Sequence, residues 1–331
     1  MLANSFRNNH SPAAPMGKPS ASYRADIWRL GRLAAQVFPA WICRPASSIA
    51  AWAYCQLRPR RQEIVVKNLL PALNGNHLAA QRTSRALFSN FALKLIDLWR
   101  YENGVSIDNW ISELSGWELV QNARIRKTGI LLITPHLGNW ELGAPFLIKR
   151  GINLLVLTQP EPGNLTTYRQ ASRANWGIET LVIGNNDFGF VEVINRLQNG
   201  AAVALLIDRP HSAKTITTQL FGRPFQASVA PAELARATGC TILPVYVIKK
   251  ATAYAAHALP PIEYDRLKLR DREYRRQFTQ KIVHTFEPII VQYLDQWYHF
   301  VPVWGLAKDQ ESLAGTNSTV LENQLLNYSS K

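Results

Sequence analysis

Residues 130–143, ILLITPHLGNWELG, combine the pattern of a buried strand with a proline and a histidine that directly precede a helix-like segment. The uninterrupted apolar run at its start is typical of a strand that is covered on both faces of a parallel sheet. Asn139 is a favourable N-cap residue, which places Glu141 in the first turn of the helix. The stretch therefore predicts that His136 lies at the carboxyl end of a strand, with a carboxylate five positions further on.

The same alternation of apolar strands and helices continues to about residue 296. We predict strands over 128–135, 152–159, 178–184, 201–208, 241–250 and 253–262, helices over 139–151, 164–177, 187–200, 230–240 and 271–296, and a loop over 208–218. Such alternation indicates an α/β fold with a mainly parallel central sheet flanked by helices. Ligands of these sheets bind beyond the carboxyl ends of the strands. His136 and Asp208 both end predicted strands, so we expect the chemistry there.

The composition of the chain divides it into four segments. We predict a disordered tail over 1–23 and a polar tail over 305–331, because neither has the apolar pattern of a packed element. The first of these tails also lacks the apolar core of a signal peptide. Residues 24–115 read as a helical region, and 116–304 as the α/β region, which forms one domain with the preceding helices.

The net charge of the chain is strongly positive, since 37 Lys and Arg residues against 23 Asp and Glu residues give +14 over 331 residues. This charge favours a polyanionic partner, either nucleic acid or an anionic membrane surface. No recognition-helix motif or RNA-binding aromatic signature is present, so we expect no nucleic-acid partner. The scattered Cys43, Cys55 and Cys240 have no metal-binding spacing and are expected to be reduced thiols in a cytosolic compartment.

Residues 27–57 place aliphatic and tryptophan side chains among arginines. No apolar run in this segment reaches the roughly 20 residues that span a bilayer. The pattern predicts amphipathic helices that lie on an anionic membrane surface. Two ordinary helices that cover the core would give a similar pattern, and the basic charge of the chain favours the membrane.

The spacing of His136 and Glu141 limits what the pair can do. Residues five apart lie on different faces of a continuous helix, so the pair does not match a helix-borne zinc site, which needs a spacing of four. With the histidine in the turn, the carboxylate can fold back onto one imidazole nitrogen and leave the other as a general base. The nucleophile would then be a substrate hydroxyl that attacks an activated acyl group. The alternative is a histidine bound to backbone and an exposed glutamate.

Three further blocks accompany this pair and make the chain resemble a known family. The sequence resembles the lipid A biosynthesis acyltransferases (lauroyl and myristoyl transferases), within the wider lysophospholipid and glycerol-3-phosphate acyltransferases, over about residues 27–304. The residues that match are His136, Glu141, Arg173, Gly177, Asp208, Arg209, Phe221, Gly222, Thr238, Gly239, Pro244 and the aromatic segment 294–304. The segment 226–234 lacks a glycine that is usual in this family, and the closing segment lacks a His-Arg-Arg run.

The resemblance implies a fold like that of glycerol-3-phosphate acyltransferases, with membrane-associated N-terminal helices and an acyltransferase α/β domain. It implies transfer of a fatty acyl chain from an acyl carrier protein or coenzyme A thioester to a hydroxyl of a lipid A precursor or related glycolipid. His136 would be the base and Glu141 its orienting carboxylate. Substrate-binding residues are expected to be Arg173, Arg169, Asp208, Arg209 and Asn139. No metal or organic cofactor is implied, and the expected location is the cytoplasmic face of the bacterial inner membrane.

Three alternatives stay open at this point. The first is a lysophospholipid or other glycolipid O-acyltransferase, and the remote ones are a nucleic-acid-binding protein and a non-catalytic membrane-interaction protein. For an acyltransferase we also expect an apolar groove beside His136, lined from residues 142–148 and the flanking strands, with Leu142 and Phe146 as the residues that set chain length.

Overall fold

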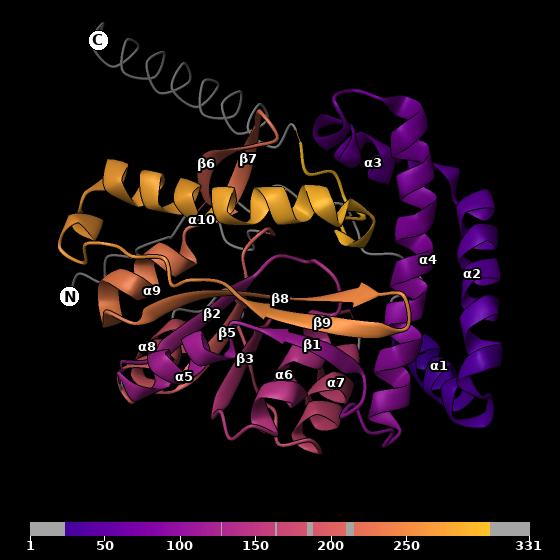
Figure 1. The fold of residues 1–331 in the computed structure, drawn as a ribbon, viewed down its shortest axis with the longest axis horizontal. Coiled ribbons are helices and arrows are strands. Elements are labelled where there is room, and N and C mark those ends of the chain that lie inside the picture. Colours follow the sequence, from indigo (N-terminus) through magenta and orange to yellow (C-terminus); the bar gives the residue numbers. More distant parts are fainter. Residues whose placement is uncertain (1–23, 127, 163, 184–187, 210–214, 305–331) are drawn as a thin grey trace, which may run out of the picture.

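A seven-stranded sheet with helices packed around it forms the centre of the molecule (Figure 1). The structure, a computed structural model, describes residues 24–126, 128–162, 164–183, 188–209 and 215–304. The tails predicted over 1–23 and 305–331 lie outside the described residues.

The order of the strands is β1-β9-β8-β2-β5-β3-β4. These strands are β1 (Ile111–Ser115), β2 (Ile130–Thr134), β3 (Leu154–Thr158), β4 (Glu179–Val182), β5 (Ala202–Leu206), β8 (Thr241–Lys250) and β9 (Ala253–Ala258). Strands β8 and β9 pair antiparallel, and the other five neighbouring pairs of the described sheet are parallel. The predicted α/β fold with a mostly parallel sheet is confirmed.

Helices cover the sheet, and a separate hairpin, β6–β7, packs against the last long helix, α10. The elements are α5 (Trp117–Ile125), α6 (Trp140–Ile148), α7 (Leu165–Ala174), α8 (Phe188–Gln198), β6 (Thr215–Leu220), β7 (Arg223–Ser228), α9 (Ala230–Thr238), η2 (Lys268–Arg270), α10 (Arg272–Gln292) and η3 (Leu294–Gln296). Helix α6 packs on β3 and β8, whereas α8 packs on β5 and α9. Helix α10 contacts both strands of the β6–β7 hairpin.

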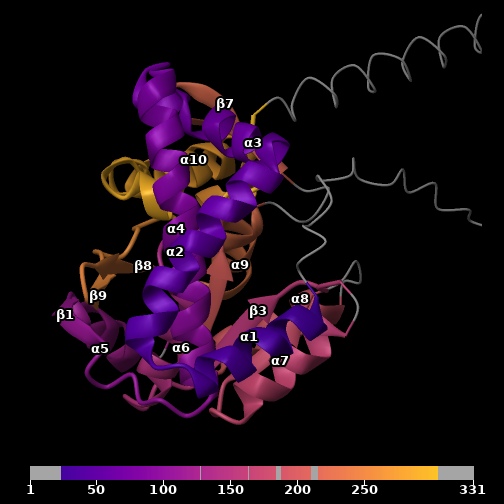
Figure 2. The same cartoon turned by 90° about the vertical axis from the view of Figure 1, so that its right-hand side faces the viewer.

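The N-terminal helices stand beside the sheet around one long helix (Figures 1 and 2). They are α1 (Ala25–Val37), α2 (Ala40–Leu57), α3 (Pro59–Leu69), η1 (Pro71–Leu73) and α4 (His77–Glu102). Helices α1, α2 and α3 each pack against α4. Among the described helices, none combines the length and the apolar character that crossing a membrane requires.

The structure differs from the predicted elements at several boundaries. Residues 60–115 were expected to be helical, but α4 ends at Glu102, and 111–115 form β1, which pairs with β9. The chain leaves the helix at Gly104, whose φ of +91° suits glycine. Strand β6 begins at Thr215, inside the expected loop 208–218. No prediction covered α5 or β7.

The central strand β2 is buried along its whole length. Leu131 and Ile133 belong to the large core cluster that also includes Leu87 and Phe286 from α4 and α10. Leu132 points to the opposite face, into a second cluster with residues of α5 and β8. Both faces of β2 are therefore covered by apolar side chains, which explains the uninterrupted apolar run in its sequence.

Candidate active site

His136 and Asp208 meet because they follow neighbouring parallel strands in equivalent positions. Thr134 at the end of β2 is in register with Leu206 at the end of β5. Two residues beyond each of these lie His136 and Asp208, and both side chains are buried. The expectation that both lie at the carboxyl edge of the sheet is confirmed.

The Asp208 carboxylate accepts hydrogen bonds from four groups. Its Oδ1 lies 2.6 Å from Nδ1 of His136, and its Oδ2 lies 2.9 Å from the His136 backbone nitrogen. Oδ2 also accepts from Nε1 of Trp297 at 2.9 Å and lies 2.8 Å from Nε2 of His299. Because an ionised carboxylate only accepts, we assign the His136 proton to Nδ1. Nε2 of His136 then carries a lone pair, and no described residue hydrogen-bonds to it.

The surroundings keep the imidazole of His136 in its basic form. Burial and, to a smaller extent, the nearby Arg209 guanidinium lower its pKa to about 3, although Asp208 acts in the opposite direction. Burial alone would raise the pKa of Asp208, but His136 and His299 outweigh this effect and hold it well below its usual value. At neutral pH the pair is therefore a carboxylate and a neutral imidazole, which is the state of a general base that is ready to accept a proton.

The turn that carries His136 is fixed by backbone contacts on both sides. The Gly138 N–H donates to the Gln296 carbonyl at 2.9 Å, and the Asn139 N–H donates to the Val247 carbonyl at 2.7 Å. Gly138 has a φ of +60°, and a Cβ at this position would lie 2.0 Å from the Val247 oxygen. Tyr298 N–H donates to the His136 carbonyl at 2.8 Å. The chain after α10 thus holds the turn in place, and glycine is required at position 138.

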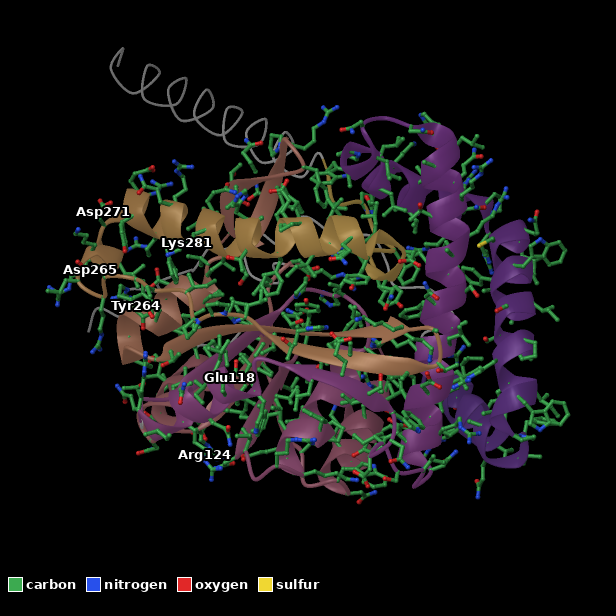
Figure 3. The ribbon with its side chains drawn as sticks, viewed as in Figure 1. Glu118, Arg124, Tyr264, Asp265, Asp271 and Lys281 are labelled. Atoms are coloured by element: carbon green, nitrogen blue, oxygen red, sulfur yellow. The ribbon has the colours of Figure 1, made fainter. Side chains whose placement is uncertain are left out.

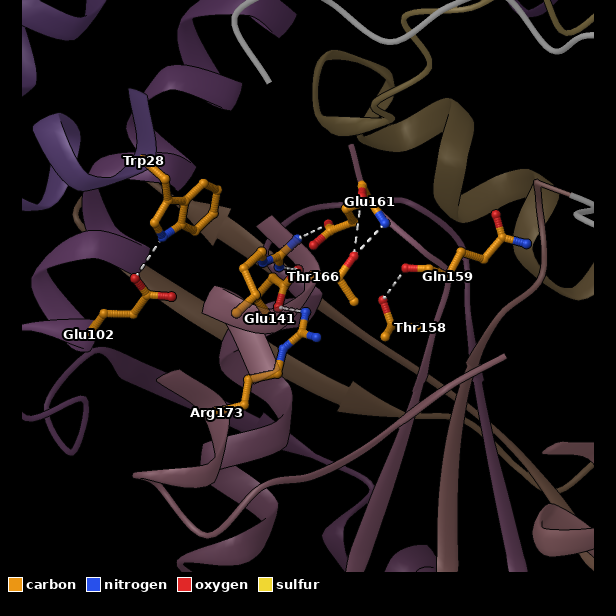
Figure 4. Close-up of polar contacts among 9 residues, drawn as sticks. Trp28, Glu102, Glu141, Thr158, Gln159, Glu161, Thr166 and Arg173 are labelled. Carbon is orange, nitrogen blue, oxygen red and sulfur yellow. Dashed lines mark hydrogen bonds and ion pairs between the residues drawn. The ribbon is translucent and has the colours of Figure 1, made fainter. Parts of the chain in front are cut away.

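Glu141 lies in the first turn of α6, as expected, but its carboxylate does not orient His136. It forms ion pairs with Arg169 and Arg173 of α7, the latter at 3.0 Å, and Figure 4 shows Glu141 and Arg173 pointing toward one another. The imidazole Nδ1–H of His136, which was expected to donate to Glu141, donates to Asp208 instead. The physical reason is charge: two guanidinium groups attract a carboxylate more strongly than a neutral imidazole does.

The cluster of Glu141, Arg169 and Arg173 is extended by Glu161, which forms an ion pair with Arg169. Burial alone would raise the pKa of Glu141, but Arg169, Arg173 and Lys94 outweigh it and lower the pKa. Glu141 is therefore ionised, and the two arginines that were expected to bind substrate are held at the cavity wall by it.

The two other predicted binding residues, Arg209 and Asn139, differ in their access to the cavity. Arg209 lines it and donates to the Tyr298 carbonyl at 2.5 Å. Asn139 is the N-cap of α6, but its side chain forms no capping bond and instead donates to the Tyr254 hydroxyl at 3.2 Å. Asn139 is buried and does not line the cavity, so the structure gives it a place in the interior rather than against a substrate.

A cavity of about 2760 Å³ opens from His136 and reaches between the sheet and α6. Its apolar lining includes Leu132, Val156, Ala204 and Val245 of the sheet and Ala144 and Leu147 of α6, and helix α4 adds Phe88 and Phe91. Leu142 and Phe146, which were expected to line a groove here, are buried and are not among its lining residues. They lie on the other face of α6, in a cluster with Trp28 and Leu98.

His136, Asp208 and His299 also form a set of possible metal ligands, with ligand atoms within 4.8 Å of one another. In this arrangement the carboxylate lies between the two imidazoles and accepts an N–H from each. The short distances among the three residues are therefore accounted for by hydrogen bonds.

Trp297 and His299 were not singled out from the sequence. Both belong to the aromatic segment 294–304, which the resemblance had marked only as a block. Their bonds to Asp208 cross about ninety residues of sequence, and nothing in the local pattern of the segment points to that carboxylate.

The fold and the site together define an α/β protein with a buried histidine at the carboxyl edge of a mostly parallel sheet, facing a large cavity. The family model described as bacterial lipid A biosynthesis acyltransferase matches residues 27–305. The chain belongs to this family, as its sequence blocks predicted.

The chain is similar to phosphatidylinositol mannoside acyltransferases of two mycobacteria. It is 24% identical to the one of Mycobacterium tuberculosis strain H37Rv over 193 residues, which are 58% of this chain and 59% of that protein. It is 23% identical to the one of Mycolicibacterium smegmatis over 192 residues, 57% of this chain and 61% of the relative. The chain is thus matched to about three fifths of the length of these curated relatives.

Proposed function

We propose that the protein transfers a fatty acyl chain from a thioester of acyl carrier protein or coenzyme A to a hydroxyl group of a glycolipid. The observation that carries this proposal is the imidazole of His136, which is held by Asp208 through Nδ1 and faces the cavity with Nε2 unprotonated. A neutral imidazole in this state can take the proton of a substrate hydroxyl. Family membership supports the acyl group as the group that is transferred.

The proposed reaction is a direct transfer. The acceptor oxygen attacks the thioester carbonyl while its proton passes to Nε2 of His136. The carbon–sulfur bond then breaks, and the thiolate leaves with the proton of the imidazolium. Asp208 stabilises the transient positive charge through Nδ1, because the carboxylate is ionised and only 2.6 Å away.

The cavity supports a long apolar chain as the group that is transferred. Its lining includes aliphatic side chains of the sheet and of α6, together with charged residues such as Glu141, Arg173 and Arg209. Burying an acyl chain there removes apolar surface from water at about 25 cal/mol per Å². The thioester carbonyl would then lie where the apolar lining meets His136.

The acceptor that we propose is a glycolipid, either a lipid A precursor or a related one. The names of the mycobacterial relatives, which refer to phosphatidylinositol mannoside, support a sugar-bearing lipid as the class. A lysophospholipid hydroxyl would satisfy the same chemistry and is the second candidate.

A surface of exposed apolar side chains on α1 and α2 supports the proposal that the protein binds to a membrane surface. Trp41 and Trp52 are 74% and 63% exposed, respectively. The other large apolar side chains of this surface are Ile27, Leu30, Leu33, Val37, Phe38, Ile49 and Leu57. Exposed arginines accompany them, among them Arg29 and Arg44. We propose that this surface lies on the anionic cytoplasmic face of the bacterial inner membrane, where acyl thioesters are available.

Vesicle binding tests the membrane proposal. The double variant Trp41→Glu, Trp52→Glu should bind vesicles that contain phosphatidylglycerol at least tenfold more weakly, since burying one large apolar side chain contributes about 1.5–3 kcal/mol. Leu267→Glu is the matched control, because Leu267 is exposed as well and follows Asp265, which Figure 3 shows at the end of the molecule opposite to α1 and α2. Equal binding by both variants would contradict the proposal.

The reaction itself is tested with the purified chain, radiolabelled acyl carrier protein or coenzyme A thioesters, and a panel of lipid acceptors. Thin-layer chromatography should show label in a glycolipid product with the wild-type protein and none with His136→Ala. Label that appears only as free fatty acid would identify a thioesterase. Label in a lysophospholipid product would favour the second candidate.

A further inference from the structure

Lys94 of α4 is a buried lysine on the wall of the cavity. Lys94 is only 4% exposed, and it is one of the residues that line the cavity. Its Nζ lies 3.0 Å from the centre of the Trp140 ring and 5.7 Å from the rings of Phe91 and Tyr298. Three aromatic rings therefore surround the ammonium group, in the arrangement of a cation–π contact.

Within the described part of the chain, no carboxylate lies within ion-pair distance of this ammonium group, and no hydrogen bond to it is formed. The charged groups that face it are Glu141, Arg169, Arg173 and Arg209. Glu141 is engaged by the two arginines of α7. Burial lowers the pKa of Lys94 well below its usual value; Glu141 raises it, and the arginines lower it further. Lys94 thus lies among an excess of positive charge, in a place where an anion would be stabilised.

The distance from Lys94 to the base limits which anion can bind. Trp140, which contacts the ammonium group, also contacts His136, with ring centres 5.1 Å apart. An anion on Lys94 therefore lies one aromatic ring away from the reacting hydroxyl. In the thioester donors, the phosphate of the pantetheine arm is separated from the sulfur by a long flexible chain. The donor phosphate would accordingly lie farther from His136 than Lys94 does.

We propose that Lys94 binds a phosphate group of the acceptor lipid and so selects acceptors that carry a phosphate close to the acylated hydroxyl. This inference rests on the proposed acyl transfer and names the class of acceptor. A phosphate offers the ammonium group charge-assisted hydrogen bonds that the aromatic rings do not. The aromatic rings hold the Lys94 side chain at the cavity wall when no lipid is bound, and their π faces favour its charged form when an anion binds.

Binding measured by titration calorimetry tests the proposal without catalysis. The probes are a short-chain phosphatidylinositol, an uncharged octyl glycoside and 4′-phosphopantetheine. Lys94→Gln should weaken binding of the phosphatidylinositol by about 10- to 100-fold, the range for a hydrogen bond to a charged group, and leave the other two probes unchanged. A loss that affects 4′-phosphopantetheine instead assigns Lys94 to the donor and overturns the proposal, as does no loss at all.

The number of protons taken up when phosphatidylinositol binds gives a second measurement, and a lysine with a purely structural role would not affect it. Repeating the phosphatidylinositol titration in buffers of different ionisation enthalpy should show that the wild-type protein takes up protons, because the anion favours charged Lys94. Lys94→Met should show no such uptake. This variant is apolar and of similar length, so it should fold at least as stably as the wild-type chain.

Kinetics with matched acceptors complete the test. Lys94→Gln should raise KM for a phosphorylated glycolipid by about 10- to 100-fold, with little change in KM for its unphosphorylated counterpart. Lys149→Gln is the control, because Lys149 is exposed and paired with Asp108 outside the cavity. An equal loss with both acceptors would overturn the proposal. If the wild-type protein acylates neither acceptor, the proposed reaction fails, and the binding comparison still decides the role of Lys94.

Discussion

Asp208 and Glu141 are two carboxylates beside the turn of His136, the first buried and the second 14% exposed, and their partners differ in charge. Asp208 is held by two imidazoles, an indole and a backbone N–H, none of which has to be charged in the resting protein. Glu141 is held by two guanidinium groups that are always charged. The first arrangement leaves one imidazole nitrogen free to accept a proton. The second joins a carboxylate, whose pKa the cations lower, to two guanidinium groups and leaves no imidazole nitrogen free.

The difference shows that proximity in sequence does not decide which carboxylate serves a histidine. Glu141 is five residues from His136, whereas Asp208 is distant in sequence and adjacent in the sheet. We therefore assign the orientation of His136 to Asp208 and the positioning of Arg169 and Arg173 to Glu141. The following predictions test this division of roles.

Removing the base should have the largest effect on activity. His136→Ala should lower kcat by about 10²- to 10⁴-fold, the contribution that a general base usually makes. Far-UV circular dichroism should be unchanged, because the other three donors to Asp208 include the backbone N–H, which the variant keeps. Acyl transfer by His136→Ala close to the wild-type rate would show that His136 is not the base, and the roles assigned to both carboxylates would lose their basis.

Asp208→Asn should lower kcat by about 10²-fold or more, because an amide NH₂ facing Nδ1 favours the tautomer with the proton on Nε2. A change that only raised KM would contradict the role of Asp208.

Glu141→Gln should mainly affect stability. It leaves buried Arg169 and largely buried Arg173 without their shared counter-charge, which costs about 3 kcal/mol of unfolding free energy, measured in urea. The loss of kcat should be smaller than that for Asp208→Asn. Glu179→Gln, in an exposed pair with Arg196, is the control and should change stability little. A large loss of kcat at unchanged stability would return the orienting role to Glu141.

Acid should destabilise the Asp208 cluster before it affects the Glu141 cluster. Burial lowers the pKa of both His136 and His299 below the unfolded value of 6.5. Below pH 6.5 the unfolded chain therefore binds protons that the folded chain does not, and the stability present above this pH decreases. We expect a loss on the order of 1.4 kcal/mol per pH unit for each imidazole that stays neutral. Urea midpoints at pH 7, 6 and 5 measure it, and His299→Phe should reduce the slope.

The three cysteines should matter least. Burial raises the pKa of Cys55, and that of Cys240 to about 11, so both are protonated thiols at neutral pH. Replacing Cys43, Cys55 and Cys240 by Ala should leave kcat close to the wild-type value, with about 1 kcal/mol of stability lost per site at most. An acyl group found on a cysteine by mass spectrometry would replace direct transfer with an acyl-enzyme.

Much of the fold could be predicted because its elements have local signals. The apolar runs of β2 and β5 and the amphipathic pattern of the helices between the strands are visible in a window of ten residues. Strand β1 was missed because four of its five residues are exposed and its pairing with β9 depends on a distant segment. Edge strands of this kind carry no apolar run.

Only the part of the site that depends on local sequence signals could be predicted. The positions of His136 and Asp208 at strand ends follow from the local pattern. Their contact depends on β2 and β5 being neighbours in the sheet, and this cannot be inferred from the order of the strands in the sequence. Trp297 and His299 reach the site through the packing of the chain after α10. The Glu141 carboxylate was assigned to the wrong partner because its strongest attraction is to Arg169 and Arg173, on a different helix.

The dependence of Asp208 on residues 297 and 299 has a consequence for the chain while it is being synthesised. Helices α1 and α2 leave the ribosome first, and the turn of His136 follows, yet the segment that fixes this turn is translated last of all the described elements. A nascent chain therefore carries its exposed apolar surface long before it has a complete site. The hydrogen bonds to Asp208 can be completed only when synthesis has passed residue 299, so the order of translation places the appearance of this surface before the assembly of the site.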